Sequence, residues 1–185
     1  MRRLIWVLPV LAVLVVATAA TAQNFGKHDL RSYTQGGEYC QPCHTPHHAT
    51  QAGGDGLLWN RALALSADYT LFESSAVLGT RSLACLSCHD GVQAIEAFHG
   101  GKSTTTKLTG RLNLGRDLSD DHPVGIDYPT SSWYNPQSDT GLRYYGPARN
   151  RIECGTCHTV HEANNVYFLR KTNVNSALCL SCHKI

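Results

Sequence analysis

The sequence predicts a mostly irregular, loop-rich fold with short α-helices, and three observations support that prediction. Stretches rich in Gly, Thr and Pro run between short apolar segments, as at 100–106 and 117–140. No segment shows the long amphipathic period of a helix or the alternation of paired strands. One five-residue pattern also occurs four times and uses all 8 cysteines of the chain. The fold is therefore expected to depend on what those cysteines bind.

The repeated pattern is Cys-X-X-Cys-His, the spacing of a covalent c-type haem attachment site. Its thiols form thioether bonds to one porphyrin, and the following histidine binds the iron. The eight cysteines predicted to attach haem c are Cys40, Cys43, Cys85, Cys88, Cys154, Cys157, Cys179 and Cys182. The four predicted proximal iron ligands are His44, His89, His158 and His183. Four covalently attached haems are therefore expected, with no cysteine left for a disulfide.

Two other types of site use Cys-X-X-Cys, namely structural zinc sites and redox dithiols. Zinc does not require a histidine directly after the second cysteine of every copy, and a dithiol enzyme needs a single motif within a βαβ pattern. Both interpretations explain less of the sequence than haem does, and zinc is the stronger of the two.

The first 22 residues are predicted to be a secretory signal peptide. Arg2 and Arg3 follow Met1, residues 4–16 are apolar, and small residues ending in Ala-Thr-Ala precede Gln23. An uncleaved anchor is the alternative. Removing residues 1–22 would bring the basic residues level with the 14 acidic residues. The protein is therefore expected to be exported, to the periplasm or the cell exterior, where c-type haem is attached.

Three segments are expected to be helical in the exported part. Residues 57–65 fit one or two helical turns, residues 74–86 fit a short helix leading into the second motif, and residues 176–183 fit a helix carrying the fourth. The segments between them are expected to be loops held by cofactors.

The motifs form an internal repeat. Each half reads Cys-X-X-Cys-His-Thr-X-His, a spacer and then Cys-Leu-Ser-Cys-His. Residues 23–99 and 141–185 are therefore predicted to be two dihaem modules, joined by a linking loop at about 100–140. Four porphyrins in residues 23–185 leave about 40 residues for each, too few for separate pockets. The sequence thus predicts one tetrahaem domain, residues 23–185, in which the haems form much of the core.

The second axial ligand of each iron is expected to be another histidine, because the only methionine is Met1. The histidines outside the motifs are His28, His47, His48, His99, His122 and His161. The repeat position of His47 and His161 pairs His47 with the second haem and His161 with the fourth. His28 and His122 are assigned to the two remaining irons. His48 and His99 receive no assignment.

Several segments resemble the doubled-CXXCH multihaem cytochromes of the cytochrome c3 superfamily. They include Cys-X-X-Cys-His-Thr-Pro-His at 40–47, Leu-Trp-Asn-Arg at 58–61, Cys-Leu-Ser-Cys-His-Asp-Gly at 85–91 and His-Pro-Val-Gly at 122–125. This resemblance implies an exported electron carrier. Some exported tetrahaem proteins of this broad group polymerise into extracellular filaments in which a histidine of one subunit ligates a haem of the next.

An iron with two imidazole ligands has no open position, so the expected function is one-electron transfer and not enzymatic catalysis. The expected partners are redox donor and acceptor proteins or extracellular acceptors. Because no basic run with interleaved aromatic residues is present, nucleic acid is not expected. A soluble periplasmic carrier and a small reductase with one open iron are the alternatives. In a head-to-tail homopolymer, His28 is expected to reach a haem of the neighbouring subunit.

Overall fold

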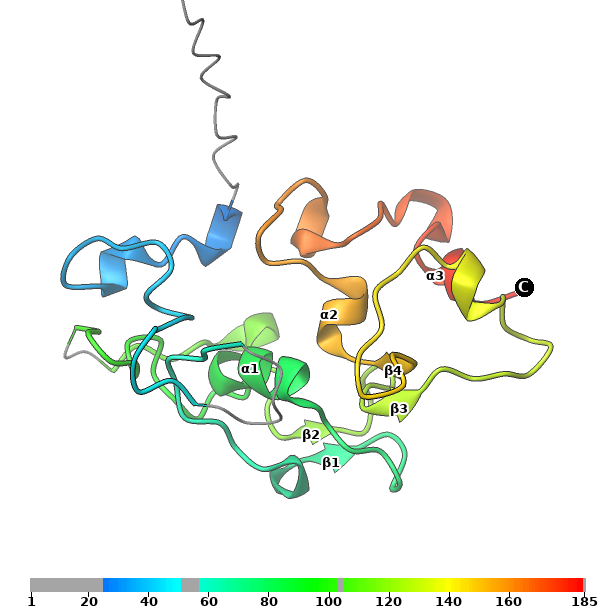
Figure 1. Cartoon of the computed structure of the whole chain (residues 1–185), viewed down its shortest axis with the longest axis horizontal. Helices are drawn as coiled ribbons and strands as arrows, with labels where there is room; N and C mark the ends of the chain where they lie inside the picture. Colours follow the sequence, from blue (N-terminus) through cyan, green and yellow to red (C-terminus); the bar gives the residue numbers. More distant parts are fainter. Residues whose placement is uncertain (1–24, 51–56, 103–104, 185) are drawn as a thin grey trace, which may run out of the picture.

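The computed structural model describes residues 25–50, 57–102 and 105–184, so the expected signal peptide lies outside the described residues. The chain follows a largely irregular path around a few short helices and two small strand pairs (Figure 1). This confirms the predicted loop-rich fold class. Among the described residues, no helix is long and apolar enough to span a bilayer.

The helices that carry labels in Figure 1 all contain Cys-X-X-Cys motifs. Helix α1, Thr80–His89, ends on the second motif, whereas α2, Cys154–Cys157, and α3, Cys179–Cys182, are single turns formed by the third and fourth. The described residues also form 3-10 turns at Gly26–His28, Arg31–Tyr33, Ser66–Asp68, Gly110–Leu112, Gln137–Asp139, Val166–Phe168 and Val174–Ser176.

Two short strand pairs tie distant segments together. Strand β1, Thr70–Leu71, pairs in parallel with β2, Asp117–Leu118, with Thr70 opposite Asp117. Strand β3, Ile126–Asp127, pairs antiparallel with β4, Arg151–Ile152, with Ile126 opposite Ile152. Each pair is too short to be stable alone, so its stability depends on the surrounding packing.

The expected helix at 74–86 is displaced toward the second motif. Residues 74–79 are not helical, because the backbone N–H of Val77 donates to the Gly125 carbonyl at 3.0 Å and that of Leu78 donates to Ser66 Oγ at 2.9 Å. The helix begins only at Thr80. Its C-terminal end is closed by the Asp90 N–H, which donates to the Leu86 carbonyl at 2.9 Å.

The expected helical turns at 57–65 are wrong. Trp59 forms isolated bridges with His44 and Thr50, and the Asn60 N–H donates to the Cys43 carbonyl at 2.9 Å. The segment is not helical because its backbone groups pair with the loop of the first motif. The expected helix at 176–183 is shorter than predicted, since α3 covers only Cys179–Cys182.

The apolar core is small and consists of two clusters. One contains Tyr69, Leu78, Leu86 and Leu118, and the other contains Tyr128, Tyr144 and Ile152. Segment 100–140, expected as a linking loop, supplies Leu118 to one cluster and Tyr128 to the other. Meanwhile Leu65 and Trp133 remain 70% and 74% exposed. The protein packing alone therefore leaves much apolar surface uncovered.

Candidate functional site

Each Cys-X-X-Cys-His motif is folded into a helical turn. The N–H of His44 donates to the Cys40 carbonyl at 2.8 Å, that of His158 to Cys154 at 3.0 Å, and that of His183 to Cys179 at 2.9 Å. The second motif forms the end of α1. Residues three apart share one face of a helical turn, so both thiols of a motif point to the same side, as one porphyrin requires.

Three of the proximal histidines are held by a backbone carbonyl. The Nδ1 atoms of His44, His89 and His158 lie 2.7, 2.8 and 2.8 Å from the carbonyl oxygens of Leu57, Leu112 and Tyr167. A carbonyl only accepts hydrogen bonds, so Nδ1 must carry the proton. The lone pair of Nε2 is then directed away from the backbone and available to iron.

The carbonyl partners could not be predicted from the sequence. Every residue carries a backbone carbonyl, whatever its side chain. The side chains of Leu57, Leu112 and Tyr167 therefore give no sign of this role. Of these three residues, only Tyr167 has an unusual backbone conformation, because its φ of 57° lies in the left-handed region. That conformation is uncommon for a bulky residue. In it, the Tyr167 carbonyl reaches His158 Nδ1.

Three proximal histidines also face a second histidine. We call these three pairs of histidines the facing pairs. Their ring centres are 6.2 Å apart in His28 and His89, 6.2 Å in His44 and His161, and 6.3 Å in His122 and His183. Imidazole nitrogens bind a metal ion at about 2 Å, so two rings on opposite sides of one ion have centres about 6 Å apart. The facing pairs match this separation.

The pairing differs from the one that the repeat predicted. His161 was expected beside the fourth motif, but its ring lies against His44, and His122 faces His183 instead. His28, and not His47, faces His89. His47 is exposed.

The cause of this difference is a contact between the N-terminal segment and the loop after the third motif. Phe25 packs edge-on against His161 with ring centres 6.1 Å apart, and His28 packs against Phe168 at 4.5 Å. This contact brings the loop of the third motif toward the first half of the chain. Equivalent positions in the sequence repeat therefore do not face equivalent motif histidines.

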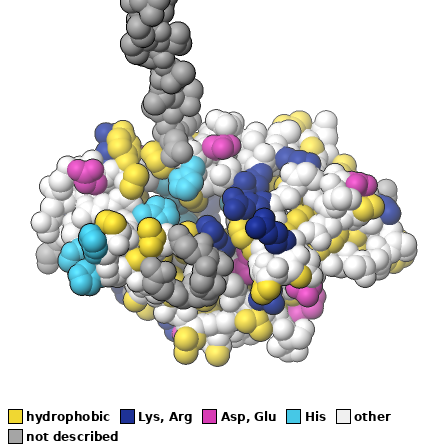
Figure 2. Space-filling view, viewed as in Figure 1, with side chains coloured by type: hydrophobic (Ala, Val, Ile, Leu, Met, Phe, Trp, Pro, Cys, Tyr) yellow, Lys and Arg dark blue, Asp and Glu magenta, His cyan; other side chains and the backbone are white. Residues whose placement is uncertain are grey.

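The third motif lacks a facing histidine within the described residues. The His158 ring is bonded to the Tyr167 carbonyl, and no described histidine forms a ring contact with it. Figure 2 shows histidine side chains on one half of the visible face, beside Lys and Arg side chains near its centre.

Burial favours the neutral form of two of the facing histidines. Burial, followed by the charges of His89 and His158, lowers the pKa of His28 to about 4. Burial and then His44 lower the pKa of His161. His28 Nδ1 is also buried without a hydrogen-bond partner. A neutral imidazole is the form that binds a metal, so both side chains are suited to ligation.

Several of the motif cysteines lie in surroundings that disfavour a free charge. Burial raises the pKa of Cys43 and of Cys157 to about 11. Cys85 and Cys154 share a hydrogen bond, which raises the pKa of Cys85 and lowers that of Cys154. Helices α1 and α2 are in contact. The second and third attachment motifs therefore meet at neighbouring thiols.

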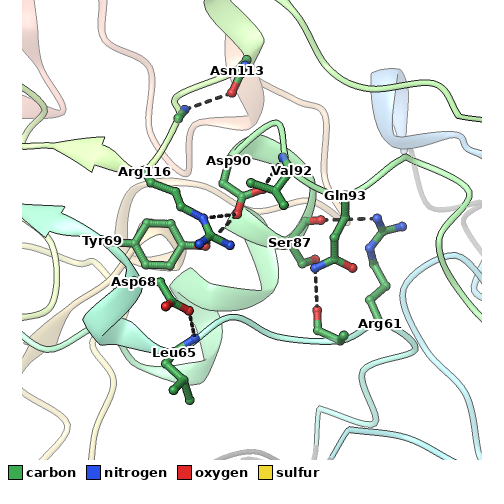
Figure 3. Close-up of polar contacts among 12 residues, drawn as sticks. Arg61, Leu65, Asp68, Tyr69, Ser87, Asp90, Val92, Gln93, Asn113 and Arg116 are labelled. Carbon is green, nitrogen blue, oxygen red and sulfur yellow. Dashed lines mark hydrogen bonds and ion pairs between the residues drawn. The ribbon is translucent and has the colours of Figure 1, made fainter.

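A buried network fixes the turn that follows His89 (Figure 3). Asp90 accepts hydrogen bonds from the Tyr69 hydroxyl at 3.1 Å, from Arg116 Nε at 3.4 Å and from the Val92 N–H at 2.9 Å. Burial, followed by the charge of Asp90, raises the pKa of Tyr69. Because Asp90 directly follows His89, this network holds the end of α1 and with it the proximal imidazole.

A second buried carboxylate links α1 to α2. Glu153 Oε1 accepts the Gly79 N–H at 2.9 Å, and Oε2 accepts the Ser82 hydroxyl, whose oxygen accepts the Cys154 N–H at 3.0 Å. A Cβ atom at position 79 would lie 2.5 Å from Oε1, so a side chain there would displace the Glu153 carboxylate. Sequence reasoning missed Glu153, because nothing in its local pattern distinguishes it from a surface residue.

We expect Glu153→Gln to flatten the pH dependence of folding stability. Burial raises the pKa of Glu153 above its ordinary value of 4.5, so the folded chain holds this proton more tightly than the unfolded chain. Its stabilising contribution is full below pH 4.5 and is lost as pH rises through the folded pKa. Denaturant unfolding at several pH values should show this decline in the wild type and not in the Gln variant.

A matched variant separates charge from hydrogen bonding. Glu153→Leu should lower the free energy of unfolding by about 1–3 kcal/mol for each stranded donor, the Gly79 N–H and the Ser82 hydroxyl. An unchanged pH slope in Glu153→Gln would show that Glu153 is not the titrating group.

The residues present fit covalently bound haem c. The motifs supply paired thiols on one face, the carbonyl-bonded imidazoles supply an oriented Nε2, and the facing pairs have the separation of two axial ligands. Among the described residues, no group of three or more His, Cys, Asp and Glu side chains is arranged to hold one ion, as a closed zinc site would require.

Comparison with protein families agrees with this fit. A family described as the doubled CXXCH motif matches residues 146–184, which contain the third and fourth motifs. No curated protein matches the chain. The match supports a multihaem c-type cytochrome, a class that transfers electrons.

Proposed function

We propose that this chain is an exported tetrahaem c-type cytochrome that carries electrons one at a time along closely spaced haems. The observation that carries the proposal is the set of facing pairs, in which a second histidine lies across from three of the four motif histidines. Two imidazole ligands close an iron to substrates, which favours electron transfer over catalysis.

The chain's own residues perform the binding and tuning. When bound, haem supplies reversible one-electron oxidation and reduction of its iron. The motif cysteines hold each porphyrin covalently, and the carbonyl bonds of His44, His89 and His158 orient the proximal rings. Ligation by nitrogen without thioether sulfur favours low potentials. The contact between α1 and α2 brings the second and third attachment motifs together, which supports transfer between the two halves.

The third motif decides between a carrier and two alternatives. His158 has no facing histidine among the described residues, an observation that favours either an open iron or a ligand from another molecule. An open iron would make the protein a small reductase. An imidazole from a second copy would make a head-to-tail polymer, because each subunit would donate to the next.

The histidine expected to bridge subunits was His28, but its ring is partly buried against His89 of the same chain. A polymer would therefore need a different imidazole. We propose His47 for this role, because it is exposed and lies three residues after His44 of the first motif. The proposed export rests on the signal-like residues 1–22, and the proposed acceptor is a redox protein or an extracellular oxidant.

The test uses the secreted protein in three measurements. Intact mass should exceed that of residues 23–185 by four haem groups, and a near-stoichiometric zinc content without a Soret band would refute the haem assignment. Light scattering and electron microscopy then report assembly. Carbon monoxide added to the reduced protein reports open irons.

Each outcome selects one function. Monomers that bind no carbon monoxide indicate a lone carrier, and monomers that bind one molecule per chain indicate an open-iron enzyme. Filaments that bind none, and that His47→Ala converts into monomers with one open iron, indicate a polymer joined through His47. Filaments that persist in His47→Ala would exclude that residue as the link.

A further inference from the structure

Two histidines outside the haem motifs face each other on the surface. The ring centres of His48 and His99 are 6.0 Å apart with an angle of 48° between the ring planes. Both residues are exposed. Their separation is close to that of the three facing pairs, although neither residue belongs to a Cys-X-X-Cys-His motif. The two imidazoles therefore form a pair in which neither member is a motif histidine.

The chain segments that carry this pair are anchored by two adjacent buried residues. Asn60 Nδ2 donates to the His99 carbonyl at 3.1 Å. The Thr50 hydroxyl, two residues after His48, donates to the Arg61 carbonyl at 2.7 Å. Asn60 and Arg61 are only 6% and 3% exposed. A common rigid support therefore holds both histidines, which lowers the entropy lost when a ligand bridges them.

The conformation of His48 also distinguishes the pair. Its φ of 59° lies in the left-handed region, which is unfavourable for a residue with a side chain. Such a conformation persists only where the surroundings impose it. Here the neighbouring Thr45 hydroxyl donates to the His47 carbonyl at 2.7 Å, which fixes the turn that leads into His48.

The two rings border an open hollow of about 400 Å³. Its lining includes His48, His99, Thr50, Asn60 and Arg61. The guanidinium of Arg61 donates to the carbonyls of Ile95 at 2.6 Å and Ala94 at 2.5 Å, which holds it in place. The hollow is open to water, and the imidazoles of His48 and His99 border it.

We propose that His48 and His99 together bind one transition-metal ion of the Zn²⁺, Ni²⁺ and Cu²⁺ class, with water completing its coordination. Imidazole nitrogen is a preferred ligand of these ions, whereas Ca²⁺ and Mg²⁺ require several oxygen ligands. This site is independent of the haem irons.

The test uses Zn²⁺ with the secreted, haem-loaded protein, because zinc is redox-inert and its X-ray absorption edge is separate from that of iron. Equilibrium dialysis should find one bound Zn²⁺ per chain. Absorption at the zinc edge of the wild-type protein should show imidazole nitrogen among the ligands. His48→Gln and His99→Gln should each abolish stoichiometric binding without changing the haem spectrum.

Ala97→Ser is the matched variant, because Ala97 is exposed and lines the same hollow but carries no imidazole, so this variant should retain the zinc. The proposal is wrong if the wild-type protein binds no zinc, or if Ala97→Ser loses it while His99→Gln keeps it. It is equally wrong if His48→Gln or His99→Gln opens a haem iron to carbon monoxide, because that histidine would then be an axial ligand. The wild-type zinc-edge measurement remains decisive if a variant fails to fold.

Discussion

Replacing His28 by alanine should open one haem iron to carbon monoxide while every thioether link remains intact. The His28 ring faces His89 at 6.2 Å, so its loss removes the only described imidazole placed opposite that proximal ligand. Attachment of the same haem depends on Cys85 and Cys88 and is not affected. The reduced variant should bind one more carbon monoxide per chain than the wild type, and its intact mass should exceed the mass of its own polypeptide by the same number of haem groups.

Two further variants make this result specific. His28→Met should restore a six-coordinate iron and raise the potential of that one haem, because thioether ligation raises the potential relative to two imidazoles. Lys27→Ala changes an exposed neighbour in the same turn and should alter neither measurement. Carbon monoxide binding by His28→Ala at the wild-type level would contradict the proposed ligand role of His28.

The second large effect concerns which haem His161 serves. The structure places His161 beside His44 and His122 beside His183, so His161→Ala should open the first iron and His122→Ala the fourth. Each variant alone should bind one additional carbon monoxide. The number of carbon monoxide molecules bound per chain is then the same for both variants. To distinguish them, both substitutions must also be made in a variant that lacks the first haem.

Changing Cys40 and Cys43 to serine provides that background, because Cys40 is exposed and neither residue lies in a helix. Without the first haem, His161→Ala should have no further effect on carbon monoxide binding, whereas His122→Ala should still open one iron. If the reverse is observed, the repeat-based pairing of His161 with the fourth haem is correct and the structural pairing is not.

The sequence predicted the fold class because the motifs and the composition agree. Four cofactor motifs in a short chain leave little room for regular structure, and the described helices are correspondingly short. Residues 57–65 show the limit of such reasoning. Their apolar spacing suits a helix, but Trp59 pairs with His44 and Thr50, and no local pattern encodes a partner that lies elsewhere in the chain.

The candidate site likewise contains residues that the sequence could predict and residues that it could not. The motif cysteines and histidines were recognisable because their chemistry is contained within five consecutive residues. The pairing of the other histidines depends on how the N-terminal segment meets the loop near Phe168, which is a tertiary contact. Glu153 was missed for a related reason, because its hydrogen-bond partners Gly79 and Ser82 are far away in sequence.

The adjacency of Cys85 and Cys154 has a consequence for biogenesis. A porphyrin has two vinyl groups, and these neighbouring thiols from different motifs are close enough to compete for them. In the proposed exported protein, a chain delivered N-terminus first would present Cys85 and Cys88 before Cys154, and N-terminal parts fold first. The order of delivery would thus prevent one porphyrin from being attached to cysteines of two different motifs. A full-length chain refolded in solution would lack this protection.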